Sequence, residues 1–189
     1  MMHPSQVEAE RWANGGGWTR TLLTWPDPAR WGLRISVANI EQAGSFSVFP
    51  GVDRWFAVLE GDGVRLATAG RPSVVVRAGD EQLHAFPGDA ATECELLDGA
   101  TRDLNVMVRR HEARTTIRLL RDGDLRSNAE LLACFACGAA TLTTGDGKPV
   151  ALAPIALAWL ANPDRETLAL KVAAPAPRGW WIEATRTDR

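Results

Sequence analysis

Hydrophobic and β-branched residues recur along the chain in short runs, several of which alternate with polar residues. In the N-terminal half these runs cover residues 33–40, 55–59, 64–67, 74–77, 92–97 and 104–108. Most have Gly, Asp or Pro close to at least one end, and no long amphipathic helical stretch separates them. Closely spaced short strands with turn signals between them are typical of β-sandwiches and barrels. We therefore predict an all-β fold.

The pattern weakens after residue 110 and then resumes. The second set of runs covers residues 115–120, 131–144, 150–160, 168–173 and 180–185. Residues 124–132 are the exception, because they predict a helical turn. Two strand-rich halves, joined near residues 109–114, predict two β-barrels in one chain, with a first domain of residues 1–110 and a second of residues 111–189.

Composition limits the classes of partner. With 189 residues, of which 46% are hydrophobic, the chain can bury a proper core. A net charge of -2 provides no basic field for a phosphate backbone, so we expect no nucleic-acid partner. The apolar run of residues 150–161 is too short to span a bilayer and contains Pro154, so we expect no membrane insertion.

Features of the termini and of the cysteines predict a cytoplasmic protein. The first residues lack a basic stretch followed by an apolar run, which a secretory signal requires. Three cysteines are an odd number and indicate reduced thiols. Cys134 and Cys137 have redox spacing, but they lie in a run of small and apolar residues typical of a buried strand. We therefore interpret them as structural thiols.

Polar and aromatic side chains are interleaved near the predicted strand ends, where they could form a small-molecule pocket. A guanidinium fork in such a pocket would suit a carboxylate ligand. The candidate residues are Asn14, Arg20, Arg34, Phe49, Asp53, Arg54, His84, Phe86, Asp103 and Asn105. The alternative is that Asp53 and Arg54 cap a turn, Arg20 and Arg34 lie on the outer face, and His84 lies at the surface or behind the site. Nucleotide-binding glycine loops and a serine nucleophile elbow are not found in the sequence.

Three long strings go beyond a general pattern: RWANGGGWTRTL (residues 11–22), LRISVANIEQAGSFSVFPGVDRWFAVLEGDGVRL (residues 33–66) and HAFPGDAATECELLDGATRDLNVMVRR (residues 84–110). In this order they resemble the HutD/Ves family of bicupins, over about residues 11–110. The resemblance implies a double-stranded β-helix (jelly-roll) fold with two barrels. It also implies frequent dimers, so a homodimer is one option for this chain.

The resemblance further implies a link to histidine utilisation, as in the HutD branch, or to cold stress, as in the Ves branch. For the first branch it suggests a binding or regulatory protein for an acidic derivative such as N-formylglutamate. The motif positions that would shape the pocket are Asn14, Arg20, Phe49, Asp53, Arg54, Phe86, Asp103 and Asn105. Thr21 departs from the pattern, because the family commonly shows an acidic residue directly after the motif arginine.

A cupin metal site requires imidazoles and a carboxylate that converge inside the barrel, and the histidines here are His3, His84 and His111. If the glycine turn at residues 60–63 is equated with that of the first cupin motif, the ligand positions fall near Ser47, Phe49 and Arg54. These side chains are poor ligands for a first-row metal. We therefore expect neither a metal nor another cofactor.

Three functions remain open from the sequence. The first is a binding protein in which Arg20 or Arg34 holds a carboxylate, Asn14 and Asn105 provide amide-type hydrogen bonds, and Phe49 and Phe86 wall the site. The second is a metal-independent enzyme with a general acid or base. Its candidates are His84, Asp53 and Asp103. The third is a protein-interaction module with an exposed tryptophan surface, formed by Trp25, Trp31 or the pair Trp180 and Trp181.

Overall fold

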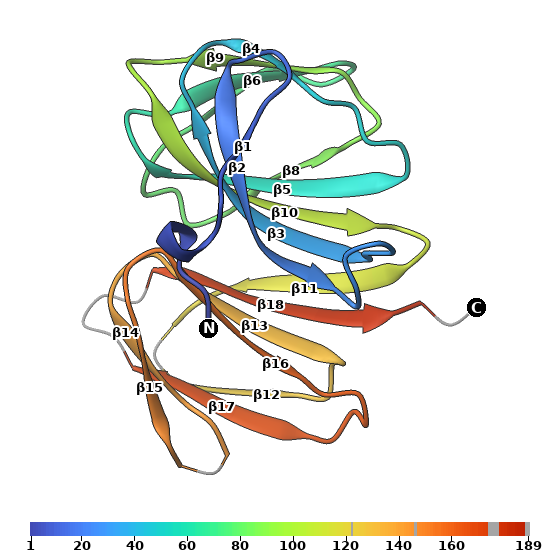
Figure 1. Ribbon diagram of the computed structural model, residues 1–189, viewed down its shortest axis with the longest axis vertical. Helices are drawn as coiled ribbons and strands as arrows, with labels where there is room; N and C mark the ends of the chain where they lie inside the picture. The colour runs from blue at the N-terminus through green and yellow to red at the C-terminus, as the bar shows by residue number, and fades with distance from the viewer. Residues whose placement is uncertain (122, 146, 174–177, 188–189) are drawn as a thin grey trace. The chain divides into compact units, whose positions relative to one another are not determined.

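The computed structural model describes residues 1–121, 123–145, 147–173 and 178–187, which fold into β-strands and one short 3-10 helix (Figure 1). Two compact units can be distinguished. The N-terminal unit comprises Val7–Glu112. The C-terminal unit comprises Met1–Gln6 together with Ala113–Arg189. No helix in the described ranges is long and apolar enough to cross a membrane.

The N-terminal unit consists of two antiparallel sheets. The larger sheet has the order β1 (Glu10–Arg11), β2 (Gly17–Trp25), β3 (Leu33–Ile40), β10 (Thr101–Arg109), β5 (Val52–Glu60) and β8 (His84–Pro87). The smaller sheet has the order β4 (Gly44–Phe46), β9 (Thr92–Leu96), β6 (Val64–Thr68) and β7 (Val74–Val76). Ile40 and Phe56 of the larger sheet pack in one buried cluster with Leu66 and Cys94 of the smaller one. The two sheets therefore enclose a common core.

The C-terminal unit is built in the same way from two four-stranded sheets. One has the order β11 (Ala113–Leu119), β18 (Gly179–Arg186), β13 (Leu131–Ala136) and β16 (Ala156–Ala161). The other has the order β12 (Gly123–Ser127), β17 (Leu168–Ala173), β14 (Ala140–Thr143) and β15 (Pro149–Leu152). The 3-10 helix η1 (Pro4–Gln6) precedes β1, and Met2 pairs with Leu157 in an isolated bridge.

The all-β prediction is confirmed, but three local predictions are wrong. The predicted run 131–144 is two strands, because the chain turns through Cys137 and Gly138 between β13 and β14. The run 150–160 is also two strands, and Ile155 adopts a φ of 57° at the turn between them. The helical turn predicted over residues 124–132 is a strand in its first part, since β12 pairs with β17 and Leu125 joins the core. A segment so short is a marginal helix, whereas pairing satisfies its backbone groups.

Register across the larger sheet of the N-terminal unit brings distant residues into two rows. Met107 lies opposite Arg34 on one side and Arg54 on the other, and Arg54 lies opposite Phe86. In the next row, Asn105 lies between Ser36 and Phe56. Because Phe56 belongs to the core and side chains two residues apart share a face, both rows face the interior of the barrel.

Candidate ligand-binding site

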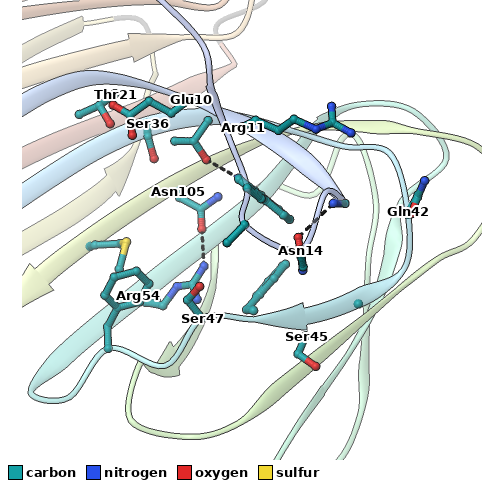
Figure 2. A pocket seen from close by; sticks show the side chains of 18 of the residues that line it. Glu10, Arg11, Asn14, Thr21, Ser36, Gln42, Ser45, Ser47, Arg54 and Asn105 are labelled. Carbon is teal, nitrogen blue, oxygen red and sulfur yellow. Dashed lines mark hydrogen bonds between the residues drawn. The ribbon is translucent and has the colours of Figure 1, made fainter.

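A cavity of about 690 Å³ opens in the N-terminal unit, within the size range of small-molecule sites. Its walls come from strands β1, β2, β3, β4, β5 and β10 and from the loops that flank β1 and β4. Figure 2 shows its polar lining: Arg54 and Asn105 lie together at one side, Asn14 at another, and Glu10, Thr21 and Ser36 gather at a third.

Arg54 is the most buried charged side chain of this lining. Only 7% of the residue is exposed, and its Nη2 atom donates a hydrogen bond of 2.9 Å to Oδ1 of Asn105. The guanidinium carbon lies 4.8 Å from the ring centre of Phe46 and 4.9 Å from that of Phe86. Burial, with a smaller contribution from the charge of Arg34, lowers the pKa of Arg54 to about 10. The group therefore remains a cation at neutral pH, held between aromatic rings.

Arg34 provides a second cation on the same wall. Its Nη2 atom donates to Sδ of Met107 at 2.9 Å, and its guanidinium carbon lies 5.1 Å from the ring centre of Trp31 and 5.3 Å from that of Phe49. Burial lowers the pKa of Arg34, the charge of Glu10 raises it, and the charge of Arg109 lowers it again.

Neither Arg34 nor Arg54 is held by a carboxylate in the part of the chain that the structure describes. Among the described residues, no carboxylate forms an ion pair with Arg34 or Arg54 within 4.0 Å. The Nε atoms of both side chains are buried, and neither has a hydrogen-bond partner among the residues that the structure describes. Cations removed from water without a counter-charge are costly, and an anion placed between them would recover much of this cost.

The Asn-Gly-Gly-Gly segment shapes another wall. Oδ1 of Asn14 accepts a hydrogen bond of 3.0 Å from the backbone N–H of Gly16. At Gly17 a Cβ atom would lie 2.3 Å from the carbonyl oxygen of Asn39, so this position requires glycine. Trp12 donates its indole N–H to Thr19 at 2.7 Å. These contacts fold the loop against β2 and β3 and bring Asn14 to the edge of the cavity.

The structure brings together five of the ten residues that the sequence predicts for the site, and these line the cavity: Asn14, Arg34, Phe49, Arg54 and Asn105. Phe86 lies behind them, 3% exposed and against Arg54. His84 stacks on Phe86 with ring centres 5.6 Å apart, and burial followed by the charge of Arg71 lowers its pKa.

The remaining three predicted residues have other partners and do not line the cavity. Arg20 donates to Oδ1 of Asn39 at 3.1 Å. Asp53 pairs with Arg110 at 2.6 Å. Asp103 is fully buried and accepts a hydrogen bond of 2.9 Å from Oγ1 of Thr101. Burial raises the pKa of Asp103 to about 8.

Several lining residues were not predicted from the sequence, notably Glu10 and Met107. Met107 carried a usable signal, because it lies two residues from the predicted Asn105 on the same strand. Glu10 carried none, since it belongs to a two-residue edge strand.

The tryptophan surface predicted for a protein-interaction module is wrong. Trp25 and Trp31 are each 8% exposed, Trp180 is 1% exposed and Trp181 is 5% exposed. Trp31 packs with Val52 and Met107, and Trp181 belongs to the core of the C-terminal unit. These large side chains therefore contribute to cores and cannot form an exposed patch.

The residues of the cavity do not fit a transition metal. The positions that correspond to cupin ligands, Ser47, Phe49 and Arg54, all line the cavity and offer a hydroxyl, a phenyl ring and a cation. In the described ranges no group of three His, Cys, Asp or Glu side chains could hold a metal ion. Two guanidinium groups at this place favour an anion instead.

Neither the three thiols of the chain nor a smaller hollow in the C-terminal unit has the features of a reactive or acid-binding site. Burial raises the pKa of Cys94 and Cys134 to about 12 and that of Cys137 to about 11, which disfavours the nucleophilic thiolate. The hollow has a volume of about 140 Å³ and no charged side chain in its lining. The side chains of this described lining therefore offer no cation for an acid.

The family model named HutD matches residues 4–176 of the sequence. The chain belongs to the HutD family. A 21.2 kDa protein from the region 3′ of hutC in Pseudomonas putida is 35% identical over 143 residues, which cover 74% of each chain. The protein Ves of Cronobacter sakazakii is 28% identical over 179 residues, which cover 94% of this chain and 84% of Ves.

Solved structures agree with this HutD-family assignment. A conserved protein of unknown function from Pseudomonas aeruginosa has a TM-score of 0.86 at 30% identity, over 97% of both chains. HutD from Pseudomonas fluorescens, in a formate condition, has a TM-score of 0.85 at 25% identity, over 98% of this chain and 97% of that one. A cupin barrel protein from Leptotrichia buccalis, at 11% identity over 97% and 93% of the chains, has a TM-score of 0.58 and supports the fold alone. The predicted bicupin fold is confirmed.

Thr21 is the position at which we expected an acidic residue from the HutD-family pattern. It lies opposite Ser36 and faces the cavity. Glu10, on β1, lies opposite Thr19 of β2, and Thr19 is two residues from Thr21 on β2. Glu10 therefore gives this end of the cavity a carboxylate from the neighbouring strand (Figure 2).

Proposed function

We propose that this HutD-family protein binds a small acidic amino-acid derivative, such as N-formylglutamate, in a binding or regulatory role linked to histidine utilisation. The observation that carries the proposal is the pair of guanidinium groups of Arg34 and Arg54, which face one cavity without a carboxylate partner among the described residues. A cavity with two unneutralised cations selects anions of small size.

The other lining groups support an amino-acid derivative over a simple inorganic anion. Asn14 and Asn105 provide amide groups, which pair with the amide or carboxylate of such a ligand. Phe49 and Met107 provide apolar surface for its carbon chain. The link to histidine utilisation is supported by the names of the relatives, one from the hutC region and one called HutD.

Binding is favoured over turnover by the positions of the candidate acid–base groups. A general acid or base must come within hydrogen-bond reach of its substrate. His84, Asp53 and Asp103 do not line the cavity, and Asp53 is already paired with Arg110. None of these three candidates therefore supports a metal-independent enzyme.

The proposal is tested by thermal unfolding of the protein with histidine, urocanate, formiminoglutamate, N-formylglutamate and glutamate at millimolar concentration. A ligand that binds only the folded state raises its stability, by about 2.7 kcal/mol at a concentration one hundred times Kd. We expect the acidic compounds to raise the unfolding temperature, with formate as the smallest carboxylate control. No rise with any acidic compound would contradict the proposal.

Replacing Arg54 should separate binding from stability. Arg54→Met keeps a flexible, unbranched side chain but removes the guanidinium and its charge, so we expect the acid-induced rise in unfolding temperature to disappear. Without ligand the variant should unfold at the same temperature or a higher one, because it removes a buried charge that lacks a counter-ion. Arg65→Met is the matched control, since Arg65 lies on β6 with 47% of its side chain exposed. Retention of the full ligand effect in Arg54→Met would place the anion elsewhere.

A further inference from the structure

Among the described residues that line the cavity, Glu10 is the acidic one. It is exposed at the surface of the protein and lies on the edge strand β1 opposite Thr19. An acidic group at the entrance of an anion site weakens the binding of any anion that approaches it. Because Glu10 lines the same cavity as two cations, a ligand that suits the whole site must carry a hydrogen-bond donor for Glu10 as well as negative charge for the arginines.

Glu10 and Arg34 are neighbours without being bound to each other. Both side chains line the same cavity. Burial lowers the pKa of the Arg34 guanidinium, and the charge of Glu10 offsets only part of this effect. The two groups nevertheless form no ion pair within 4.0 Å, and Arg34 donates to Met107 instead. An acceptor and a cationic donor thus line the same cavity and interact through their charges, without a direct ion pair.

One chemical group complements such a pair, namely a carboxylate on a carbon atom that also carries an N–H. Its carboxylate would accept hydrogen bonds from Arg34, and the adjacent N–H would donate to Glu10. Hydrogen bonds to a charged group contribute more than neutral ones. A ligand that lacks the N–H would leave Glu10 facing a CH₂ group and close to a carboxylate.

Arg54 and Asn105 form the other end of the site. Arg34 and Arg54 lie on strands separated by β10, which puts their backbones about 10 Å apart. In Figure 2, Asn105 lies between Glu10 and Arg54. Two acidic groups can therefore be held separately, one at each guanidinium, by a ligand of a few carbon atoms.

We propose that Glu10 is a specificity-determining residue of the anion site, which selects dicarboxylic acids with an N–H next to one carboxylate. Arg34 and Glu10 hold that end, and Arg54 with Asn105 holds the second carboxylate. The ligand class is an α-amino dicarboxylic acid or its N-acyl form. This inference rests on the proposed function, because it requires that an acid binds in this cavity.

The test compares dissociation constants of N-formylglutamate, glutamate and glutarate, measured by calorimetry. Glutarate has the same five-carbon chain and both carboxylates but no N–H. For the unmodified protein we expect glutarate to bind at least about tenfold more weakly than the better of the other two, as expected for one hydrogen bond to a charged group. Whether glutamate or N-formylglutamate is the better ligand identifies the free or the acylated amine.

Two variants test whether Glu10 causes the preference for an acid with an N–H group over glutarate. In Glu10→Gln we expect the preference over glutarate to fall by about threefold or more, because a charge-assisted hydrogen bond becomes neutral and the repulsion of glutarate is removed. Glu41→Gln is the matched control: Glu41 is exposed and does not line the cavity, so the preference should stay unchanged. An equal change of all three constants in Glu10→Gln, or an unchanged preference, would overturn the inference alone. If no acid binds the unmodified protein, the proposed function and the inference both fail.

Discussion

At the scale of single residues, Asp103 is a carboxyl group enclosed in the interior of the N-terminal unit. It lies on β10, two residues from Asn105 on the same face, and is 0% exposed. Thr101 donates to Oδ2, whereas Oδ1 is buried without a partner. Burial raises the pKa of Asp103 to about 8, so the side chain is a neutral acid at pH 7.

This protonation predicts how stability changes with pH. Between the ordinary pKa of 3.8 and the folded value of about 8, the folded state keeps a proton that the unfolded state releases. The contribution of Asp103 to the free energy of unfolding is therefore largest below pH 3.8. It decreases as the pH rises towards 8, by up to about 1.4 kcal/mol per pH unit. Asp103→Asn should remove this decline and gain stability relative to the unmodified protein from pH 5 to pH 8. Urea unfolding at several pH values measures it, and equal slopes for both proteins would contradict it.

A site residue could be predicted where the local sequence determines its position, and not where contacts with distant segments do. Arg34, Arg54 and Asn105 could be found because they lie inside recognisable strings on regular strands. Asp53 is also in such a string, but its charge is used by Arg110, which is distant in sequence. Glu10 reaches the cavity only because the loop after it folds back to pair β1 with β2. Such partners depend on tertiary contacts that local patterns do not encode.

At the scale of elements, a clasp of three charged residues holds the turn before β5. Arg110 pairs with Asp53 at 2.6 Å and with Asp89, and Oδ1 of Asp89 accepts from the backbone N–H of Gly51 at 2.7 Å. This turn carries Phe49, whose ring walls the cavity and lies 5.3 Å from the guanidinium of Arg34. The clasp therefore positions a wall of the anion site from outside.

Gly88 allows the two segments of this clasp to approach. Its N–H donates to the carbonyl oxygen of Val52 at 2.7 Å, and its own carbonyl oxygen accepts from Phe49 at 2.7 Å. A Cβ atom at position 88 would lie 2.9 Å from the Val52 oxygen and 3.0 Å from the Phe49 oxygen, both of which belong to the backbone. The turn would have to move to accept it.

We therefore expect Gly88→Ala to lower the free energy of unfolding by about 1–3 kcal/mol and to weaken the binding of N-formylglutamate. Gly138→Ala is the control, because nothing lies within 4 Å of a Cβ atom there. That variant should stay within about 0.5 kcal/mol of the unmodified protein. Urea unfolding and calorimetry provide both numbers. Equal stability of the two variants would contradict this role of Gly88.

The strands themselves were predictable where apolar and β-branched residues form a regular run in the sequence. The run at residues 33–40 has the same limits as β3. The strand β2 was missed although it has nine residues, because threonines and Arg20 interrupt its apolar positions. The pairs β13 with β14 and β15 with β16 were each predicted as one run, because their turns consist of small or apolar residues that resemble strand residues.

At the scale of the whole molecule, two units of the same class differ in chemistry. The N-terminal unit has a cavity of about 690 Å³ lined by the buried cation Arg54 and the half-buried cation Arg34. The hollow of the C-terminal unit has about 140 Å³ and no charged side chain in the described lining. The sequence could predict this asymmetry, since the strings that resemble the family end at Arg110. It could not predict that the two arginines lack counter-ions, because this depends on which carboxylates the fold brings within reach.

The most direct test of the central claim is a crystal structure of the protein with N-formylglutamate at millimolar concentration. We predict density for the ligand in the cavity of the N-terminal unit, with carboxylate oxygens about 2.7–3.0 Å from guanidinium nitrogens of Arg54 or Arg34. Ligand density at another place would contradict the claim. A cavity in which carboxylates of the protein itself neutralise both arginines would contradict it equally.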